Sequence, residues 1–354
     1  MLPVPEVALL RLAAQWVAGP GGASPVDVVR RLGAVQGQDF PGAVTSIALR
    51  TADRRRSDVE MALDDGEIVR SWPMRGTLHV LAADDLHWML ALLSTRAMAG
   101  LAGRRERLLL TEADVERARE IVLGALDGGR RMRRADLLAA IEDGGVATTG
   151  QRGYHLLWYL AQTGTLCLGP TDGAGEQLFV LLDDWVRTPR RLAGEEALGE
   201  LARRFFLGHG PATVQDLARW AGIPLRDVRA GLAVARPELE ALDVDGVEHL
   251  MDPATPDRLA GCRKAAGGLF LLPGFDEFVL GYGDRRAILD PEFADRIVPG
   301  NNGMFRSTVV HGGRIVGTWQ WTGRGAKRTV TATPFTSFPE ALTAEIRDRA
   351  ARLP

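Results

Sequence analysis

The feature that most constrains the fold is a pattern of elements that recurs three times along the chain. Each copy predicts a helix, a short helix, a second helix and then a pair of strands. The copies span roughly residues 5–82, 111–183 and 194–252. A helix-turn-helix followed by a β-hairpin is the arrangement of a winged helix. The sequence therefore predicts an α+β protein with three winged-helix units in tandem.

The short helices support this alignment, because an aspartate recurs at the same step of each copy. The segments Val26-Asp27-Val28, Ala135-Asp136-Leu137 and Gln215-Asp216-Leu217 match one another. In the first copy, Ser24-Pro25 supplies a helix N-cap with proline at the first helical position. Three matches in succession favour a true repeat over a chance pattern.

The C-terminal part of the chain follows a different pattern. Residues Leu269–Phe335 alternate apolar and polar residues and contain many glycines, which predicts antiparallel strands or a small barrel. Residues Phe338–Leu353 predict a terminal amphipathic helix. The expected domains are winged helix 1 over 1–82, winged helix 2 over 83–190, winged helix 3 over 191–260, and a β-rich region over 261–354.

Composition bounds what the chain can do. Its 354 residues are 46% hydrophobic and 25% charged, as in ordinary globular proteins of two or three domains. Neither a signal peptide nor an apolar run of about 18 residues is present, so we expect a cytoplasmic protein with no membrane partner. Two distant cysteines and six scattered histidines lack metal-ligand spacing, so we expect no metal and no cofactor. A monomer is the default expectation.

Tandem winged helices indicate nucleic-acid binding, although some serve only protein contacts. The net charge of −2 argues mildly against indiscriminate binding, so local cations matter more. Arg75 lies in the turn of the first strand pair, and a basic loop within 322–328 carries Arg324, Lys327 and Arg328. These four residues are the candidate DNA-binding side chains. The alternatives are an ordinary solvated loop tip for the basic residues and, for His79 beside Arg75, a buried structural histidine.

Two glutamines one residue apart, Gln36 and Gln38, are the candidate catalytic residues. In an extended segment, residues i and i+2 project to the same side, and each amide offers two donors and one acceptor. Such a pair could hold a water molecule, or could simply form a polar helix end. The adjacent carboxylates Asp276 and Glu277 support an acid/base site only weakly, because neighbours on a strand face opposite ways.

Four motifs together resemble the bacterial DNA glycosylases typified by AlkZ and YcaQ. They are Val35-Gln36-Gly37-Gln38-Asp39, Pro73-Met74-Arg75-Gly76-Thr77-Leu78-His79, Pro273-Gly274-Phe275-Asp276 and Val316-Gly317-Thr318-Trp319. The resemblance covers nearly the whole chain and implies the three winged helices with a β-rich C-terminal part. In this family, the catalytic motif is Gln, an apolar residue, then Gln or Asp, so Gln36 and Gln38 fall on it. Gly37 stands where a larger residue is usual.

The resemblance implies a monofunctional enzyme that removes N7-alkylated purines, including bulky adducts or interstrand crosslinks, in DNA repair or self-resistance to genotoxic natural products. Its partner would be double-stranded DNA carrying alkylated bases. A positively charged purine leaves easily, so a water held by two amides near the sugar would suffice. The competing interpretations are a winged-helix transcriptional regulator without enzymatic activity and a protein-interaction scaffold.

Overall fold

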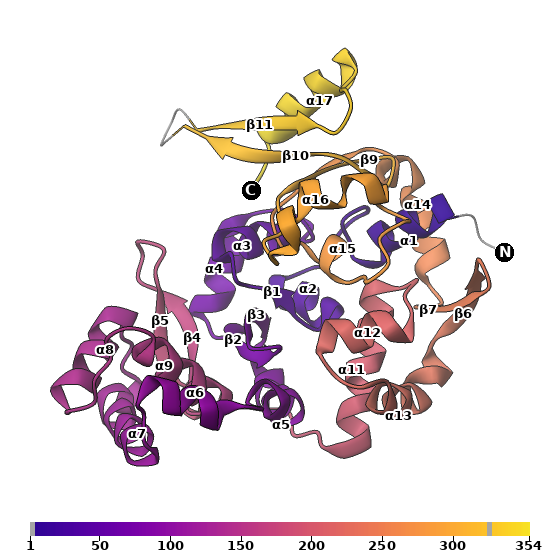
Figure 1. Ribbon diagram of the computed structural model, residues 1–354. Helices are drawn as coiled ribbons and strands as arrows, with labels where there is room; N and C mark the ends of the chain where they lie inside the picture. Colours follow the sequence, from indigo (N-terminus) through magenta and orange to yellow (C-terminus); the bar gives the residue numbers. More distant parts are fainter. Residues whose placement is uncertain (1–3, 324–327) are drawn as a thin grey trace. The chain divides into compact units, whose positions relative to one another are not determined.

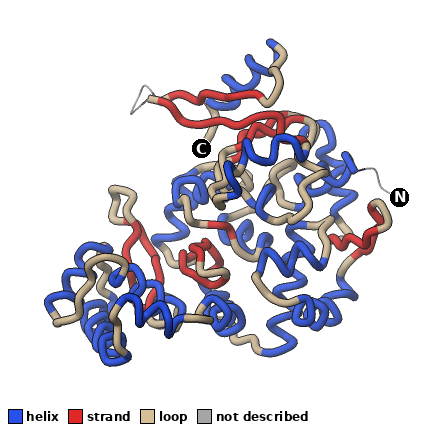
Figure 2. The backbone as a smooth tube through the Cα atoms, viewed as in Figure 1, coloured by secondary structure: helices blue, strands red, loops and turns tan. Residues whose placement is uncertain are grey.

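The computed structural model describes residues 4–323 and 328–354, and its backbone contacts divide the chain into two compact units. Unit 1 comprises residues 1–59 and 198–354, and unit 2 comprises residues 60–197. Figure 1 labels the elements, and Figure 2 distinguishes helices, strands and loops by colour. Among the described residues, no helix combines the length and apolar composition that crossing a bilayer requires.

The N-terminal part of unit 1 places the glutamine motif between two helices. Its elements are α1 (Val4–Ala14), α2 (Pro25–Leu32), β1 (Val35–Gln36), α3 (Phe40–Ala48) and the start of α4 (Arg56–Asp64). The predicted N-cap is confirmed: the Ser24 hydroxyl accepts from the backbone N–H of Asp27, and the Asp27 carboxylate accepts from Ser24. Gly33 ends α2 with a φ of 76°, in the left-handed region that favours glycine.

The third copy of the repeat also belongs to unit 1, apart from the first residues of α11. Its elements are α11 (Gly194–His209), α12 (Val214–Ala221), α13 (Leu225–Ala235), η3 (Arg236–Glu238), β6 (Glu240–Val244) and β7 (Val247–Met251). Strands β6 and β7 pair in antiparallel register around Asp245-Gly246, both with positive φ, as a two-residue hairpin turn requires.

The recurring aspartate has a local cause. Asp27, Asp136 and Asp216 each occupy the third position of a helix, α2, α8 (Arg134–Asp143) and α12 respectively. Asp27 and Asp216 close capping boxes with Ser24 and Thr213, whereas α8 begins after Arg133 without a side-chain cap. The match seen in the sequence is therefore a signature of helix starts.

The C-terminal part of unit 1 is an open antiparallel sheet rather than a barrel. Its strands are β8 (Leu269–Leu272), β9 (Thr308–His311), β10 (Arg314–Thr322) and β11 (Thr329–Pro334), in the order β11-β10-β9-β8. Helix α17 (Glu340–Ala350) packs on this sheet (Figure 1), with Leu342 and Ile346 against Leu269 and Trp319. The terminal helix was predicted correctly.

The small barrel was a wrong expectation. Between β8 and β9 the described chain forms short helices instead of further strands: α15 (Glu277–Leu280), η4 (Pro291–Phe293), α16 (Ala294–Ile297) and η5 (Pro299–Asn301). Prolines start the two 3-10 turns and Asp276 caps α15. Proline cannot donate to a strand ladder, so the alternating pattern of this stretch does not become sheet. Helix α14 (Thr255–Ala266), which was not predicted, precedes β8.

Unit 2 holds a sheet whose strands run in the order β3-β2-β4-β5. Its elements are β2 (Ile68–Met74), β3 (Thr77–Ala82), η1 (Ala83–Asp85), α5 (Leu86–Ala97), α6 (Leu101–Leu108), α7 (Glu112–Leu126), η2 (Asp127–Gly129), α8, α9 (Arg152–Gln162), β4 (Leu166–Thr171), β5 (Gln177–Leu181) and α10 (Leu182–Trp185). Two antiparallel pairs, β2–β3 and β4–β5, join through Arg70 opposite Leu168. The two predicted strand pairs therefore share one sheet.

The predicted copies of the repeat and the two compact units divide the chain differently. The first copy is split after Val59, with α1–α3 in unit 1 and its strand pair in unit 2. Helices α5 and α6, between the first two copies, were not predicted. The order of helices and strands matches the expectation in the second and third copies, whereas the first copy also contains β1 and α4. The assignment of three winged-helix domains stays a prediction.

Candidate active site

The glutamine motif lies on the short connection between α2 and α3. Gln36 ends strand β1 and is buried, with 7% of its surface exposed, whereas Gln38 is exposed. Gly37 between them is buried, and its φ lies outside the left-handed region. The backbone at this position therefore does not itself demand glycine.

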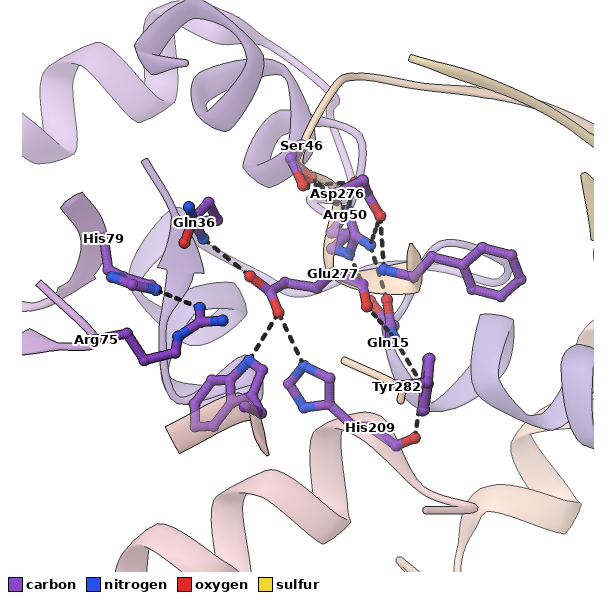
Figure 3. A network of polar contacts seen from close by, with 12 residues as sticks. Gln15, Gln36, Ser46, Arg50, Arg75, His79, His209, Asp276, Glu277 and Tyr282 are labelled. Atoms are coloured by element: carbon purple, nitrogen blue, oxygen red, sulfur yellow. Dashed lines mark hydrogen bonds and ion pairs between the residues drawn. The ribbon is translucent and has the colours of Figure 1, made fainter. Parts of the chain in front are cut away.

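A buried carboxylate holds the motif in place. The backbone N–H of Gln36 donates to Glu277 Oε1 over 2.9 Å. The other carboxylate oxygen, Oε2, accepts from Trp220 Nε1 at 2.9 Å and contacts His209 Nε2 at 3.3 Å. Figure 3 shows Gln36 and His209 on either side of Glu277. The three donors come from β1, α11 and α12. One carboxylate thus joins the motif to two helices of the third copy of the repeat.

The charge on Glu277 is stabilised although the side chain is completely buried. Burial alone raises the pKa of Glu277, but the hydrogen bonds from His209, Gln36 and Trp220 favour the carboxylate and bring the pKa below its ordinary value. A carboxylate can only accept, so His209 Nε2 carries the proton of this contact. The imidazole ring stacks on Phe205, with ring centres 4.7 Å apart, which fixes its orientation.

A second buried charge lies beside the first. Asp276 forms a two-point ion pair with Arg50, at 2.8 Å and 2.9 Å, and both side chains have no exposed surface. Ser46 of α3 also donates to Asp276 at 2.7 Å. Because Arg50 follows α3 closely, this pair ties the helix after the motif to the start of α15, where Glu277 lies.

The two clusters are bridged by neutral side chains. Arg50 Nη2 donates to Gln15 Oε1 at 2.9 Å, Gln15 Nε2 donates to the Tyr282 hydroxyl at 2.9 Å, and that hydroxyl donates to the backbone carbonyl of His209 at 2.7 Å. The polar groups around the motif therefore form one connected network (Figure 3). Such networks fix geometry, because a member left unsatisfied costs free energy.

The remaining predicted site residues lie elsewhere or outside the described chain. Arg75 belongs to unit 2; it is exposed, has a φ of 55° in the β2–β3 turn, and contacts Nε2 of the buried His79 at 3.1 Å. Arg328 of unit 1 precedes β11, and its guanidinium carbon lies 4.2 Å from the centre of the Trp321 ring. Arg324 and Lys327 fall outside the described residues.

Several residues of this site were not predicted. The sequence predicts Glu277 and Asp276 only as a weakly supported acid/base pair on a strand, whereas in the structure they start a helical turn and contact different partners. His209, Trp220 and Arg50 carried no recognisable motif. The available signal was the placing of two adjacent carboxylates between phenylalanines, since buried charges require partners. Within residues 4–323 and 328–354, no three His, Cys, Asp or Glu side chains are arranged to hold a metal ion.

Comparison with known proteins decides between the competing interpretations. The model of the AlkZ-like DNA glycosylase family matches residues 29–354. The chain belongs to this family. The match includes both glutamines and every residue of the Glu277 cluster. The family is one of DNA glycosylases, so the chain is an enzyme that acts on N-glycosyl bonds of DNA and not a transcriptional regulator.

Two comparisons, both with a DNA glycosylase from Streptomyces sahachiroi, agree with this assignment. The chain is 28% identical over 328 residues to an interstrand DNA cross-link repair glycosylase, covering 89% of this chain and 87% of that relative. It is similar to the solved structure of the DNA glycosylase AlkZ at a TM-score of 0.80 and 26% identity, covering 99% and 96% of the two chains. This AlkZ-like fold agrees with the predicted α+β class.

Proposed function

We propose that this AlkZ-like glycosylase hydrolyses the N-glycosidic bond of N7-alkylated purines, with bulky adducts or interstrand crosslinks as its substrates. The observation that carries the proposal is the Gln36–Gln38 motif anchored on Glu277 within a chain of this family. A similar protein is described as an interstrand DNA cross-link repair glycosylase, which supports the crosslink as a substrate class.

The chemistry asks little of the enzyme, because the substrate is already activated. Alkylation at N7 makes the purine cationic. When the bond between the sugar C1′ and N9 breaks, its electron pair passes to the purine and leaves a neutral alkylated base. A water molecule then adds to C1′, and its proton passes to solvent. A neutral amide cannot accept that proton, so the two glutamines act by orienting the water and stabilising developing positive charge on the sugar.

The rigid attachment of the motif supports this role. An amide gains catalytic value only when it is held in place before the reaction. Glu277 fixes the backbone of Gln36, and Arg50 with Asp276 fixes the helix that follows. Gln38 is exposed, so the motif offers one amide to a ligand arriving from solvent. We propose Gln36 and Gln38 as the catalytic residues on this basis.

Direct hydrolysis by water makes the enzyme monofunctional. The chain has only two lysines, Lys264 and Lys327, and neither is close to the motif in sequence. We propose that the product is an intact strand with an abasic site, and that the enzyme acts as a monomer. Arg75, Arg324, Lys327 and Arg328 are the proposed contacts to DNA phosphates.

The test is a base-release assay on duplexes with one defined N7-alkylguanine, either a simple adduct, a bulky adduct or a crosslink. Free base is measured by mass spectrometry, and abasic sites are revealed with an abasic-site endonuclease. We expect release above the spontaneous rate, none from undamaged DNA, and strand breaks only after the endonuclease step. Spontaneous-level release from all three substrates would exclude the proposed substrate class, and breaks without the endonuclease would exclude a monofunctional reaction.

A further inference from the structure

Two arginines that share one pocket of unit 1 have no carboxylate partner. Arg219 lies on α12, and Arg285 lies in the loop between α15 and η4. Both line a pocket of about 480 Å³ whose apolar wall includes Pro291, Ile297 and Phe305. Neither residue was singled out as a candidate site residue in the sequence, and neither belongs to the network around Glu277.

Each arginine donates one hydrogen bond to a backbone carbonyl; the remaining donors of the exposed Arg219 face solvent, whereas Arg285 is only partly exposed. Arg219 Nη1 donates to the carbonyl of Tyr282 at 2.9 Å, and Arg285 Nε donates to the carbonyl of Val279 at 2.9 Å. Arg285 Nη2 is buried and has no hydrogen-bond partner. Among the residues that the structure describes, no acidic group lies within ion-pair distance of either guanidinium. A buried donor without an acceptor costs free energy, which an anionic ligand would recover.

The carboxylates that surround the pocket are engaged by other groups. Asp216 accepts from Thr213 and from the backbone of Gly283, and Asp284 accepts from Arg286 through both oxygens. Asp295 accepts from the backbone of Gly300. The charge of Arg286 is therefore balanced, whereas the charges of Arg219 and Arg285 are not.

The pKa of Arg285 agrees with the lack of a carboxylate partner. Burial, followed by the positive charge of Arg219, lowers the pKa of Arg285 to about 10, and Asp216 opposes the shift only in part. The positive charge of Arg219 therefore disfavours the protonated form of the largely buried Arg285 in the unliganded protein. Arg286 lines the same pocket yet has its pKa raised by its hydrogen bond to Asp284, so the unfavourable environment is that of Arg285.

We propose that Arg219 and Arg285 form a phosphate-binding site that takes one backbone phosphodiester of the DNA strand. Two arginine forks are suited to phosphate oxygens, and the mostly apolar pocket has room for the adjoining sugar beside Phe305, whose ring centre lies 5.2 Å from the Arg285 guanidinium carbon. The assignment of the phosphate to DNA rests on the proposed function. Arg219 precedes Trp220, the donor to Glu277, so α12 connects a bound phosphate to the support of the glutamine motif.

The test compares the double variant Arg219→Gln/Arg285→Gln with wild type and with Arg286→Gln as the matched control. Binding to an undamaged duplex is measured across salt concentrations. Loss of one phosphate contact lowers the slope of log affinity against log salt by about 0.9. We expect that loss, with severalfold weaker binding, in the double variant only. Unchanged slope and affinity in the double variant would overturn the proposal.

Thermal unfolding separates the sources of phosphate and excludes a folding defect. Removing two uncompensated charges is expected to raise the Tm of the double variant in chloride buffer, and inorganic phosphate at matched ionic strength is expected to raise the Tm of wild type only. A lower Tm in chloride would indicate an ordinary structural role and contradict the site. Stabilisation of wild type by phosphate together with unaltered DNA binding in the double variant would assign the site to a free anion and reject the DNA assignment.

Base release is measured separately from DNA binding. Salt-dependent binding through these two arginines, with no release of alkylated base, would reject the proposed function and leave the phosphate site standing.

Discussion

The backbone N–H of Gln36 and the carboxylate of Glu277 are 2.9 Å apart, although 241 residues separate them in the sequence. This contact joins the glutamine motif to a side chain that also binds Trp220 and His209. The motif is therefore positioned by an acidic residue that does not belong to it. Glu277 is a positioning residue in this account, because its oxygens are occupied by protein donors.

Replacing Glu277 with glutamine is expected to slow base release and leave DNA affinity largely intact. The amide has one acceptor oxygen for the donors of Gln36, Trp220 and His209, so at least one buried donor loses its partner at a cost of about 1–3 kcal/mol. Because the backbone of Gln36 loses its anchor, its amide is displaced from the reacting geometry, and single-turnover release is expected to fall roughly tenfold or more. Glu345→Gln, at an exposed glutamate of α17, is the matched control.

A double-mutant cycle distinguishes positioning from general destabilisation. If Glu277 acts through Gln36, Glu277→Gln adds little to the defect of Gln36→Ala. Fully additive defects would show that Glu277 affects catalysis independently of the motif.

Acid is expected to destabilise the wild-type protein through Glu277. Because the pKa of this group is lower in the folded protein than in the unfolded chain, its contribution is fully present above the ordinary glutamate value of 4.5 and is lost as the pH falls through the folded pKa. Urea unfolding from pH 7 to pH 3 measures this. The free energy of unfolding should fall more steeply in wild type than in Glu277→Gln, and parallel curves would contradict the pKa direction.

The Arg50–Asp276 pair is expected to dominate the stability of unit 1 around the motif. Asp276→Ala leaves the guanidinium of a fully buried arginine without its partner, which costs about 3–5 kcal/mol. Asp53→Ala removes an exposed partner of Arg55; the side chains of Arg55 and Asp53 are 62% and 69% exposed, respectively. This loss costs about 1 kcal/mol or less. Denaturant unfolding measures the free energy of unfolding of both variants. Equal decreases would show that the buried Arg50–Asp276 pair stabilises the protein no more than the exposed Arg55–Asp53 pair.

The β10–β11 hairpin is expected to contribute to DNA binding through Arg328. This residue lies over the face of Trp321, which is 37% exposed, so the cation is held at the strand end. Arg328→Ala should weaken binding of any duplex and reduce the salt slope by about 0.9. Arg352→Ala, at an exposed arginine near the C-terminus, should not. A salt slope in Arg328→Ala equal to that of wild type would remove this residue from the DNA-binding surface.

Local signals predicted the elements of this fold well. Ser24 starts α2 where the sequence places a capping residue and a proline, and the third copy of the repeat ends in the expected strand pair, β6 and β7. These structures depend on a few neighbouring residues. The stretch 273–307 was predicted less well, because its alternating pattern suggests strands whereas its prolines and the Asp276 cap produce helical turns.

The support of the site could not be predicted by the same reasoning. Gln36 and Gln38 stand out because their spacing and family resemblance are visible within three residues. Glu277, His209 and Trp220 meet only when α11, α12 and the loop after β8 pack together. Arg50 likewise finds Asp276 across 226 residues. No local pattern encodes such pairings, since each is specified by the tertiary fold.

The most direct measurement of the central claim is single-turnover release of an N7-alkylguanine by the double variant Gln36→Ala/Gln38→Ala, alongside its affinity for the same duplex. Gln151→Ala, at an exposed glutamine of unit 2, is the control. The account predicts that release by the double variant falls to the spontaneous rate while DNA affinity stays close to that of wild type and the control remains active. Wild-type release by the double variant would contradict the assignment of the two glutamines as the catalytic residues.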